Sequence, residues 1–346
     1  MKILVTGATG LIGCHAAARL AQAGHEVRAL IRDPAKLRRV MTPFRCSDAV
    51  AGVVGDVTDP AAIAEAVRGC DALLHCAGLF SHELGDAALL QSVNVRGAEL
   101  VLRAALRAGV TRIVYVSSAL ALFPPFGPVQ RASDPVANPR AMYAVTKAAA
   151  ECFARALQQS GAPVVIVYPS SVQGPHDPTV GSGPGVMVEA LRAGRVLVTD
   201  GGLAYTDARD LADLFAALFD AGDPPPRLFS TAEFLPHERY YALLRELTGR
   251  DDLAALRVPG TVLRGLGRAG DLAQRWLGRS VRLTSEGALA LTRSVPVDDA
   301  PARALLGRAP IPIEDSLRDT LVWMHAAGVL EARHVGRLAD ASAGVR

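Results

Sequence analysis

Six short apolar runs, separated by Ala- and Leu-rich stretches with helical spacing, most constrain the fold of this chain. The expected strands are Ile3–Val5, Val27–Ile31, Val50–Val54, Ala72–His75, Ile113–Val116 and Val164–Tyr168. The helical stretches between them include Ala16–Gln22, Ala61–Val67, Val95–Arg107 and Ala148–Gln158. Strands that alternate with helices need crossover connections, which produce a parallel sheet covered by helices on both faces. The sequence therefore predicts an α/β protein with a doubly wound parallel sheet.

A glycine-rich turn follows the first expected strand and leads into the first helix. It reads Thr6-Gly7-Ala8-Thr9-Gly10-Leu11-Ile12-Gly13. Glycines in such a turn allow a tight bend, a close approach of the backbone to a pyrophosphate, and close packing of helix on strand. The free N–H groups of a helix N-terminus also favour phosphate. We expect a dinucleotide to be bound by Gly7, Thr9, Gly10, Leu11, Ile12 and Gly13.

The end of the second strand indicates which dinucleotide is bound. An acidic residue there would hold the ribose hydroxyls and repel a 2′-phosphate, whereas a cation does the reverse. Arg32, with Arg39 as a second contact, favours NADP(H); NAD(H) stays open if Asp33 holds the ribose instead. Five further residues follow the third and fourth strands, where we expect them at the adenine or beside the cofactor: Asp56, Val57, Cys76, Ala77 and Gly78.

Tyr143 and Lys147 lie four residues apart in a helical stretch, so their side chains project from the same helix face. A nearby cation favours the phenolate. We therefore expect Lys147 to lower the pKa of Tyr143 and to make the phenol a better proton donor. Such spacing also occurs by chance, and it indicates catalysis only together with the dinucleotide site.

These features resemble the extended short-chain dehydrogenase/reductase family, which includes NAD(P)-dependent epimerases and dehydratases, over nearly the whole chain. Further matching segments are Gly55–Val57, Asn94–Gly97, Val116–Ala119, Pro169–Pro175 and Asp207–Ala212. The stretch Val27-Arg28-Ala29-Leu30-Ile31-Arg32-Asp33-Pro34 is similar to the dihydroflavonol-reductase-like branch. The family commonly has Arg before Pro169, and this chain departs from it with Tyr168.

The resemblance implies a role for several residues. Ser118 would be the catalytic serine, Lys147 would also hold the nicotinamide ribose, and Arg32 would bind the 2′-phosphate. The segment beside the nicotinamide would be Pro169, Ser170, Ser171 and Val172, with Tyr143 and Lys147 opposite. This set suits hydride transfer from the nicotinamide to a carbonyl carbon while Tyr143 protonates the oxygen and Ser118 hydrogen-bonds it. The expected enzyme is an NADP-dependent oxidoreductase that reduces a ketone or aldehyde, or oxidises the alcohol.

Two absences argue against the nucleotide-sugar enzymes that share this fold. Leu203 stands where the epimerases usually have an Arg for the diphosphate, and Ala119 and Leu120 stand where the dehydratases carry an acidic pair. A fairly apolar small molecule is therefore the expected substrate. Its expected contacts are Leu120, Phe123, Gln173 and His176. Nucleotide-sugar epimerase or dehydratase, hydroxysteroid dehydrogenase and a non-catalytic NADP-sensing regulator remain alternatives.

The alternation of strands and helices breaks beyond Pro169. We expect residues 1–170 to form a Rossmann domain to which 203–230 returns, and 171–202 with 231–330 to form a smaller substrate-binding lobe. Residues 331–346 are expected to be a flexible tail. The Arg-rich segment 257–282 predicts an amphipathic helix that lies on a membrane, closes over the site, or, as the favoured interpretation, packs its apolar side on the lobe.

Composition narrows the surroundings and partners. The balance of 37 basic and 34 acidic residues gives a formal charge of +3, too small to indicate a nucleic-acid binder. No apolar run is long enough to span a membrane and no export signal is visible, so a cytoplasmic location is expected. Five cysteines without a Cys-x-x-Cys pair argue against disulfides and a metal site. Besides a small carbonyl or alcohol substrate, a homodimer through paired helices is compatible with the family.

Overall fold

A seven-stranded parallel sheet forms the centre of the computed structural model, which describes residues 1–81, 84–180, 182–277, 281 and 283–341. The strand order is β10-β6-β5-β4-β1-β2-β3. The strands are β1 (Lys2–Thr6), β2 (Glu26–Ile31), β3 (Val50–Val54), β4 (Ala72–His75), β5 (Arg112–Val116), β6 (Val164–Tyr168) and β10 (Arg227–Phe229). The order reverses between β1 and β4, and ligands bind in the crevice at such a switch point. The predicted doubly wound fold is confirmed.

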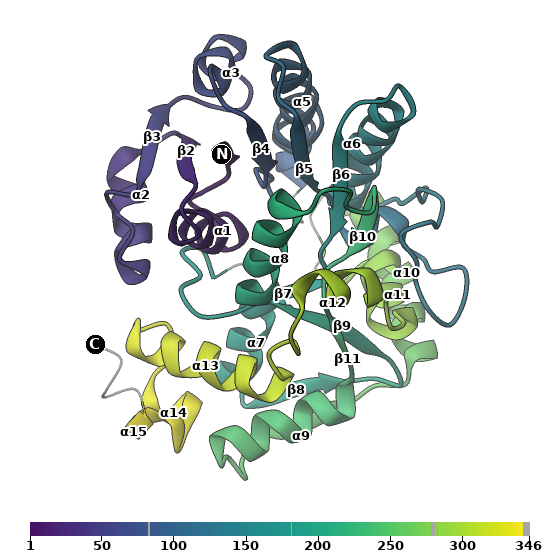
Figure 1. Ribbon diagram of the computed structural model, residues 1–346. Helices are drawn as coiled ribbons and strands as arrows, with labels where there is room; N and C mark the ends of the chain where they lie inside the picture. The colour runs from purple at the N-terminus through teal and green to yellow at the C-terminus, as the bar shows by residue number, and fades with distance from the viewer. Residues whose placement is uncertain (82–83, 181, 278–280, 282, 342–346) are drawn as a thin grey trace.

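Helices cover both faces of this sheet (Figure 1). One face carries α1 (Leu11–Gln22), α2 (Pro34–Met41) and α8 (Ala208–Asp220). The other carries α3 (Pro60–Val67), α5 (Ala98–Arg107) and α6 (Met142–Gln159). Shorter elements are α4 (Ala87–Leu90), η1 (Thr42–Phe44), η2 (Leu84–Asp86), the π-helical turn η3 (Gln91–Gly97) and η4 (Ala119–Leu122).

A second part of the molecule is built around its own small sheets. β7 (Ser171–Gln173), β9 (Gly202–Asp207) and β11 (Glu233–Pro236) form one, and β8 (Arg195–Val198) and β12 (Ala254–Arg257) form another. Its helices are α7 (Ser182–Ala193), α9 (His237–Thr248), α10 (Gly260–Leu277), α11 (Ser285–Arg293), α13 (Ile313–Ala326), α14 (Ala332–Val335) and α15 (Leu338–Ala341). We call this part the lobe. The helix α12 (Ala300–Leu306) packs instead on α8 and β10 at the central sheet.

The prediction of a flexible tail from residue 331 is wrong for residues 331–341. They form α14 and α15, and Val335 and Leu338 are buried in the core of the lobe beside α13. The two side chains are three residues apart, close enough for both to enter one apolar core. Residues 342–346 lie outside the described part of the chain.

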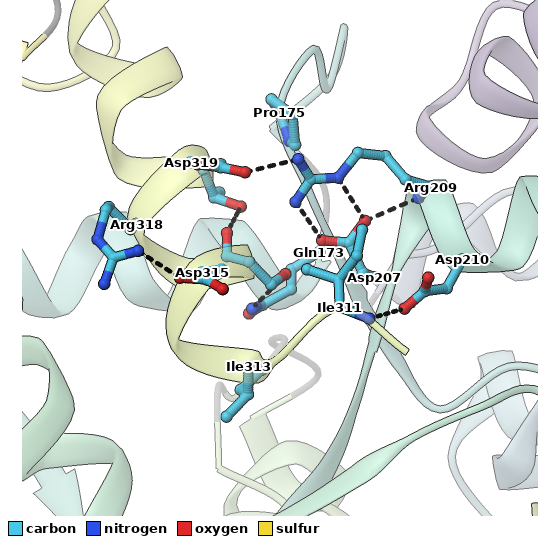
Figure 2. A network of polar contacts seen from close by, with 12 residues as sticks. Gln173, Pro175, Asp207, Arg209, Asp210, Ile311, Ile313, Asp315, Arg318 and Asp319 are labelled. Carbon is cyan, nitrogen blue, oxygen red and sulfur yellow. Dashed lines mark hydrogen bonds and ion pairs between the residues drawn. The ribbon is translucent and has the colours of Figure 1, made fainter. Parts of the chain in front are cut away.

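An arginine at the start of α8 ties the lobe to the helices of the sheet (Figure 2). Arg209 donates to both carboxylate oxygens of Asp207, at 2.9 and 2.8 Å, and to Asp319 on α13 at 2.6 Å. Burial alone would raise the pKa of Asp207, but these hydrogen bonds hold it below its usual value. In the same network Gln173 donates to Ser316 Oγ at 3.1 Å.

Candidate active site

A cleft of about 720 Å³ runs along the carboxyl ends of the central strands. It brings together segments that are far apart in the sequence: the glycine turn, the ends of β2 to β5, the start of α6 and the segment after β6. Its lining includes eighteen predicted site residues: Gly7, Thr9, Gly10, Leu11, Ile12, Gly13, Arg32, Asp56, Val57, Cys76, Ala77, Gly78, Ser118, Tyr143, Pro169, Ser170, Ser171 and Val172.

The three glycines of the turn are there for different reasons. Gly7 has a φ of +75°, and a Cβ on it would lie 2.7 Å from the backbone nitrogen of Ala77. A Cβ on Gly13 would lie 2.1 Å from the carbonyl oxygen of Gly7. A Cβ on Gly10 would meet its nearest described atom only at 3.6 Å. The protein's own packing therefore requires glycine at positions 7 and 13, but not at 10.

Gly10 is the residue that fits a bound pyrophosphate. It is the N-cap of α1, its backbone is extended, and no side chain caps the helix. The first N–H groups of α1 therefore keep their positive end toward the cleft, and the missing side chain leaves space for an anion. The turn thus fits the dinucleotide that the sequence predicts.

The cationic end of the cleft differs in one residue from the prediction. Arg32 is 79% exposed, with its Nη1 3.8 Å from Asp56 Oδ2. Asp33 caps α2 by accepting from the backbone N–H of Ala35 at 2.8 Å, so its carboxylate is already used in the helix. Lys36 lines the cleft, whereas the predicted second contact, Arg39, is exposed further along α2 and does not. Lys36 stands four residues after Arg32 in the sequence, and this spacing could have indicated that both cations lie at the cleft.

Ser118 and Tyr143 meet at the other end of the cleft. The phenol of Tyr143, in the first turn of α6, lies close enough to the side chain of Ser118 for Ser118 to lower its pKa. The Ser118 hydroxyl also accepts from the backbone N–H of Leu120 at 3.2 Å, as the cap of η4. Lys147, one turn further along α6, is buried and donates to the carbonyl oxygen of Val116 at 2.9 Å.

Burial sets the protonation of this pair. It raises the pKa of Tyr143 to about 12, and the side chain of Ser118 opposes the shift. Burial lowers the pKa of Lys147 to about 8, and the charge of Glu151 opposes it. In this structure burial sets the direction of the Tyr143 shift, and the lowering of its pKa that we expected from Lys147 is not seen. The phenol stays protonated at neutral pH.

Sequence reasoning missed a buried carboxylate behind Lys147. Glu151 is fully buried one helical turn after Lys147, and its Oε1 accepts from Tyr168 at 2.5 Å and from Arg155 at 2.7 Å. Tyr168, the departure from the family pattern, thus supports a buried acid and does not line the cleft. The spacing of Lys147, Glu151 and Arg155 along one helix face was the signal.

An apolar wall beside Tyr143 was also missed. The ring of Phe80 lies edge-on to that of Tyr143, with centroids 4.7 Å apart. Leu79, Leu89 and Val93 continue the wall. Asn94 fixes it from the π-helical turn, because its Oδ1 accepts from the N–H of Leu79 at 2.7 Å and its Nδ2 donates to the Leu79 carbonyl at 2.9 Å. The loop after β4 has no motif that would have indicated it.

The four predicted substrate contacts do not line the cleft. Phe123 is buried under η4, and Leu120 belongs to that short helix. Gln173 is buried and bonded to Ser316, while His176 packs against Phe44 and Trp323 at centroid distances of 5.4 and 6.1 Å. The described lining therefore differs from these four predictions: Gln173 and His176 make other packing contacts, and Phe123 is buried.

Known proteins resemble this chain over most of its length. A model of the NAD dependent epimerase/dehydratase family matches residues 3–230. The chain is 28% identical over 340 residues to sterol demethylase protein B of Methylococcus capsulatus, covering 95% of this chain and all of that protein. It is 27% identical over 317 residues to a 4-hydroxy-2-methyl-3-oxo-4-farnesyl-3,4-dihydroquinoline-1-oxide ketoreductase of Stigmatella aurantiaca, with 89% and 92% of the two chains covered.

A third relative is 2-alkyl-3-oxoalkanoate reductase of Stenotrophomonas maltophilia. It is 32% identical over 244 residues, which is 68% of this chain and 70% of that protein. The family match covers well over half of the chain and includes the glycine turn, Ser118, Tyr143 and Lys147. The predicted resemblance is confirmed: the chain belongs to the NAD-dependent epimerase/dehydratase family of extended short-chain dehydrogenases/reductases.

Proposed function

We propose that this protein is an NADPH-dependent reductase of a ketone or aldehyde on a fairly apolar small molecule. The observation that carries the proposal is the placement of Ser118 beside the phenol of Tyr143, at the wall of a cleft whose far end suits a dinucleotide. A phenol kept neutral by burial is a proton donor. It stands where a carbonyl oxygen beside a bound nicotinamide would need one.

Each residue has a defined part in this reaction. The dinucleotide, when bound, supplies the hydride. Tyr143 gives its proton to the carbonyl oxygen as that oxygen gains negative charge, and Ser118 hydrogen-bonds the same oxygen. Lys147 lies one turn behind the phenol and stabilises the tyrosinate left after transfer, while Glu151 favours the charged form of Lys147.

Three features favour an apolar carbonyl over a nucleotide sugar. Phe80, Leu79, Leu89 and Val93 line the cleft near Tyr143. Leu203 stands where the epimerases usually have an arginine for the diphosphate, and it lies on β9 beside the apolar core of the lobe. Two relatives carry reductase names, and one of those names describes a farnesylated substrate. Steroid ketones belong to the same apolar class, and the name of the Methylococcus relative favours including them.

Arg32 and Lys36 support the choice of NADPH. Two cations at the end of β2 and the start of α2 suit the 2′-phosphate of the adenine ribose. The Asp33 carboxylate, which would favour NADH, is held as the cap of α2.

The proposal is tested by following NADPH oxidation with aromatic ketones, aliphatic aldehydes, flavanonols and ketosteroids. Tyr143→Phe should lower kcat on any accepted substrate by at least about 100-fold while NADPH still binds. Tyr241→Phe is the matched control, since that hydroxyl donates to the Leu253 carbonyl in the lobe. Turnover by Tyr143→Phe near the wild-type rate would refute the assignment. Tight binding of a uridine or thymidine diphosphate sugar in calorimetry would favour the epimerase class instead.

A further inference from the structure

The long helix α10 leaves an apolar stripe facing outward. Its inward side packs on α11 through Leu263, Gly267 and Gly270; a Cβ on Gly267 or Gly270 would lie within 2.7 Å of a backbone oxygen of Thr284 or Leu283. The outward side carries four large apolar residues at 51, 53, 57 and 80% exposure: Val262, Leu266, Leu272 and Trp276. They recur every three to four residues when Ala269 is included, so they form one stripe. The sequence prediction that this helix packs its apolar side on the lobe therefore holds for Leu263, but not for Leu266, Leu272 and Trp276.

Arginines border this stripe. Arg268 and Arg275 are exposed, and neither has an ion-pair partner within the described part of the chain. Asp271, the acidic residue of α10, accepts from the N–H of Ser285 at 3.1 Å and so faces α11. The outward surface of α10 is therefore apolar and cationic, with its acid turned away.

We propose that α10 docks this protein on an anionic lipid bilayer. The helix would lie flat in the interface, with Leu266, Leu272 and Trp276 at the acyl boundary and Arg268 and Arg275 at the headgroups. Trp is the side chain most typical of that depth. No described helix is long and apolar enough to cross a membrane, which fits a helix that lies on the surface.

Charge favours lipid over a second copy of this chain. A two-fold pairing about the middle of the stripe would bring Arg268 toward the Arg268 of the other copy, since it stands near the middle of the helix. Like charges facing each other destabilise such an interface. Anionic headgroups satisfy both arginines along the whole stripe.

The helix α10 is connected to the segment before Tyr143 through α11. On α11, the Oε2 of Glu286 accepts from the backbone N–H groups of Arg140 at 2.6 Å and Ala141 at 2.5 Å. Ala141 is the N-cap of α6, two residues before Tyr143. If the proposed function holds, an apolar carbonyl dissolved in the bilayer would thus enter close to the residues that reduce it. The docking itself does not depend on that function.

Vesicle binding of the full-length protein tests the proposal. Sedimentation with phosphatidylcholine vesicles containing phosphatidylglycerol should show binding that weakens at least tenfold in Leu266→Ser/Leu272→Ser. Arg268→Gln/Arg275→Gln should weaken binding to the anionic vesicles about tenfold and leave binding to pure phosphatidylcholine unchanged. The matched controls are Phe126→Ser/Val186→Ser, two side chains exposed elsewhere, and Arg38→Gln/Arg39→Gln on α2; both should bind like wild type.

Trp276 gives a direct readout of depth. Its fluorescence should shift to the blue on anionic vesicles and be quenched by brominated lipid, and Trp276→Phe should remove both signals. Absent binding, or binding that survives Leu266→Ser/Leu272→Ser, overturns the proposal. So does a wild-type dimer that the same variant converts to monomer, which would make the stripe an interface between copies. NADPH turnover of a water-soluble carbonyl, measured on the same variants, separates a failure of docking from a failure of the proposed function.

Discussion

The two ends of the cleft are built by different means. At the dinucleotide end, every glycine and turn residue that the sequence singled out lines the cleft, and two of the glycines are required by packing of the turn on itself and on β4. At the carbonyl end, all four predicted contacts lie elsewhere, and Phe80 with its neighbours takes their place. The first end is specified by backbone geometry within a short segment. The second end is specified by contacts between loops that are far apart in the sequence.

A pair of glycine substitutions should break the dinucleotide end in two separable ways, and this is the largest effect we expect. Gly13→Ala places a Cβ 2.1 Å from the Gly7 oxygen and should lower the free energy of unfolding by about 3 kcal/mol or more. Gly10→Ala should cost about 1 kcal/mol or less, yet weaken NADPH binding, because its methyl group points at the phosphate. Chemical denaturation and dinucleotide titration measure both. Equal stability losses in the two variants would contradict the packing argument.

The pH dependence tests the carbonyl end. With a pKa lowered to about 8, Lys147 is charged below that pH and neutral above it. The kcat/KM for NADPH, which reports the free enzyme, should therefore fall about tenfold per pH unit above about 8. Tyr143, with its pKa near 12, should contribute no limb in this range.

Glu151→Gln sharpens that test. Removing the charge that supports Lys147 should move the alkaline limb to lower pH without affecting dinucleotide contacts. Cys152→Ser, the exposed neighbour, is the control and should keep the wild-type profile. An identical limb in Glu151→Gln and wild type would remove Glu151 from the account.

A smaller effect is expected from Arg32→Ala. Loss of one charge-assisted hydrogen bond at an exposed site, about 1.5 kcal/mol, should weaken NADPH about tenfold and NADH hardly at all. Arg39→Ala should change neither affinity, because Arg39 does not line the cleft. Equal losses for both dinucleotides in Arg32→Ala would show that its guanidinium does not meet the phosphate.

The smallest effect concerns the apolar wall. Phe80→Ala should raise KM for an apolar carbonyl about fivefold with NADPH affinity unchanged, since a truncated apolar contact costs about 1 kcal/mol. Phe126 stands three residues after the predicted contact Phe123 and is 71% exposed, and Phe126→Ala should have no effect. A larger effect of Phe126→Ala than of Phe80→Ala would contradict the role of Phe80 in the wall.

Sequence reasoning succeeded where the physical cause is local. Strand and helix periods, the glycine turn and the four-residue spacing of Tyr143 and Lys147 depend only on neighbouring residues. It failed where long-range packing decides. Trp323 and Ser316, which contact His176 and Gln173, lie on α13, more than 130 residues later in the chain. The pKa of Tyr143 follows its burial, which no sequence spacing reports. The exposed apolar stripe of α10 was missed for the same reason, because only the contact with α11 shows which side of the helix is buried.

The return of the chain to the central sheet has a consequence for how this molecule can be divided. β10 pairs with β6, although β7, α7, β8 and β9 of the lobe lie between them in the chain. Every residue of β6 is buried. A fragment that stops at residue 170 would present β6 as a bare, apolar margin without α8 above it, a template for aggregation. The central sheet and the lobe therefore cannot be separated by a single cut in the chain. A chimera that grafts a new lobe must retain α8 and β10 from the parent.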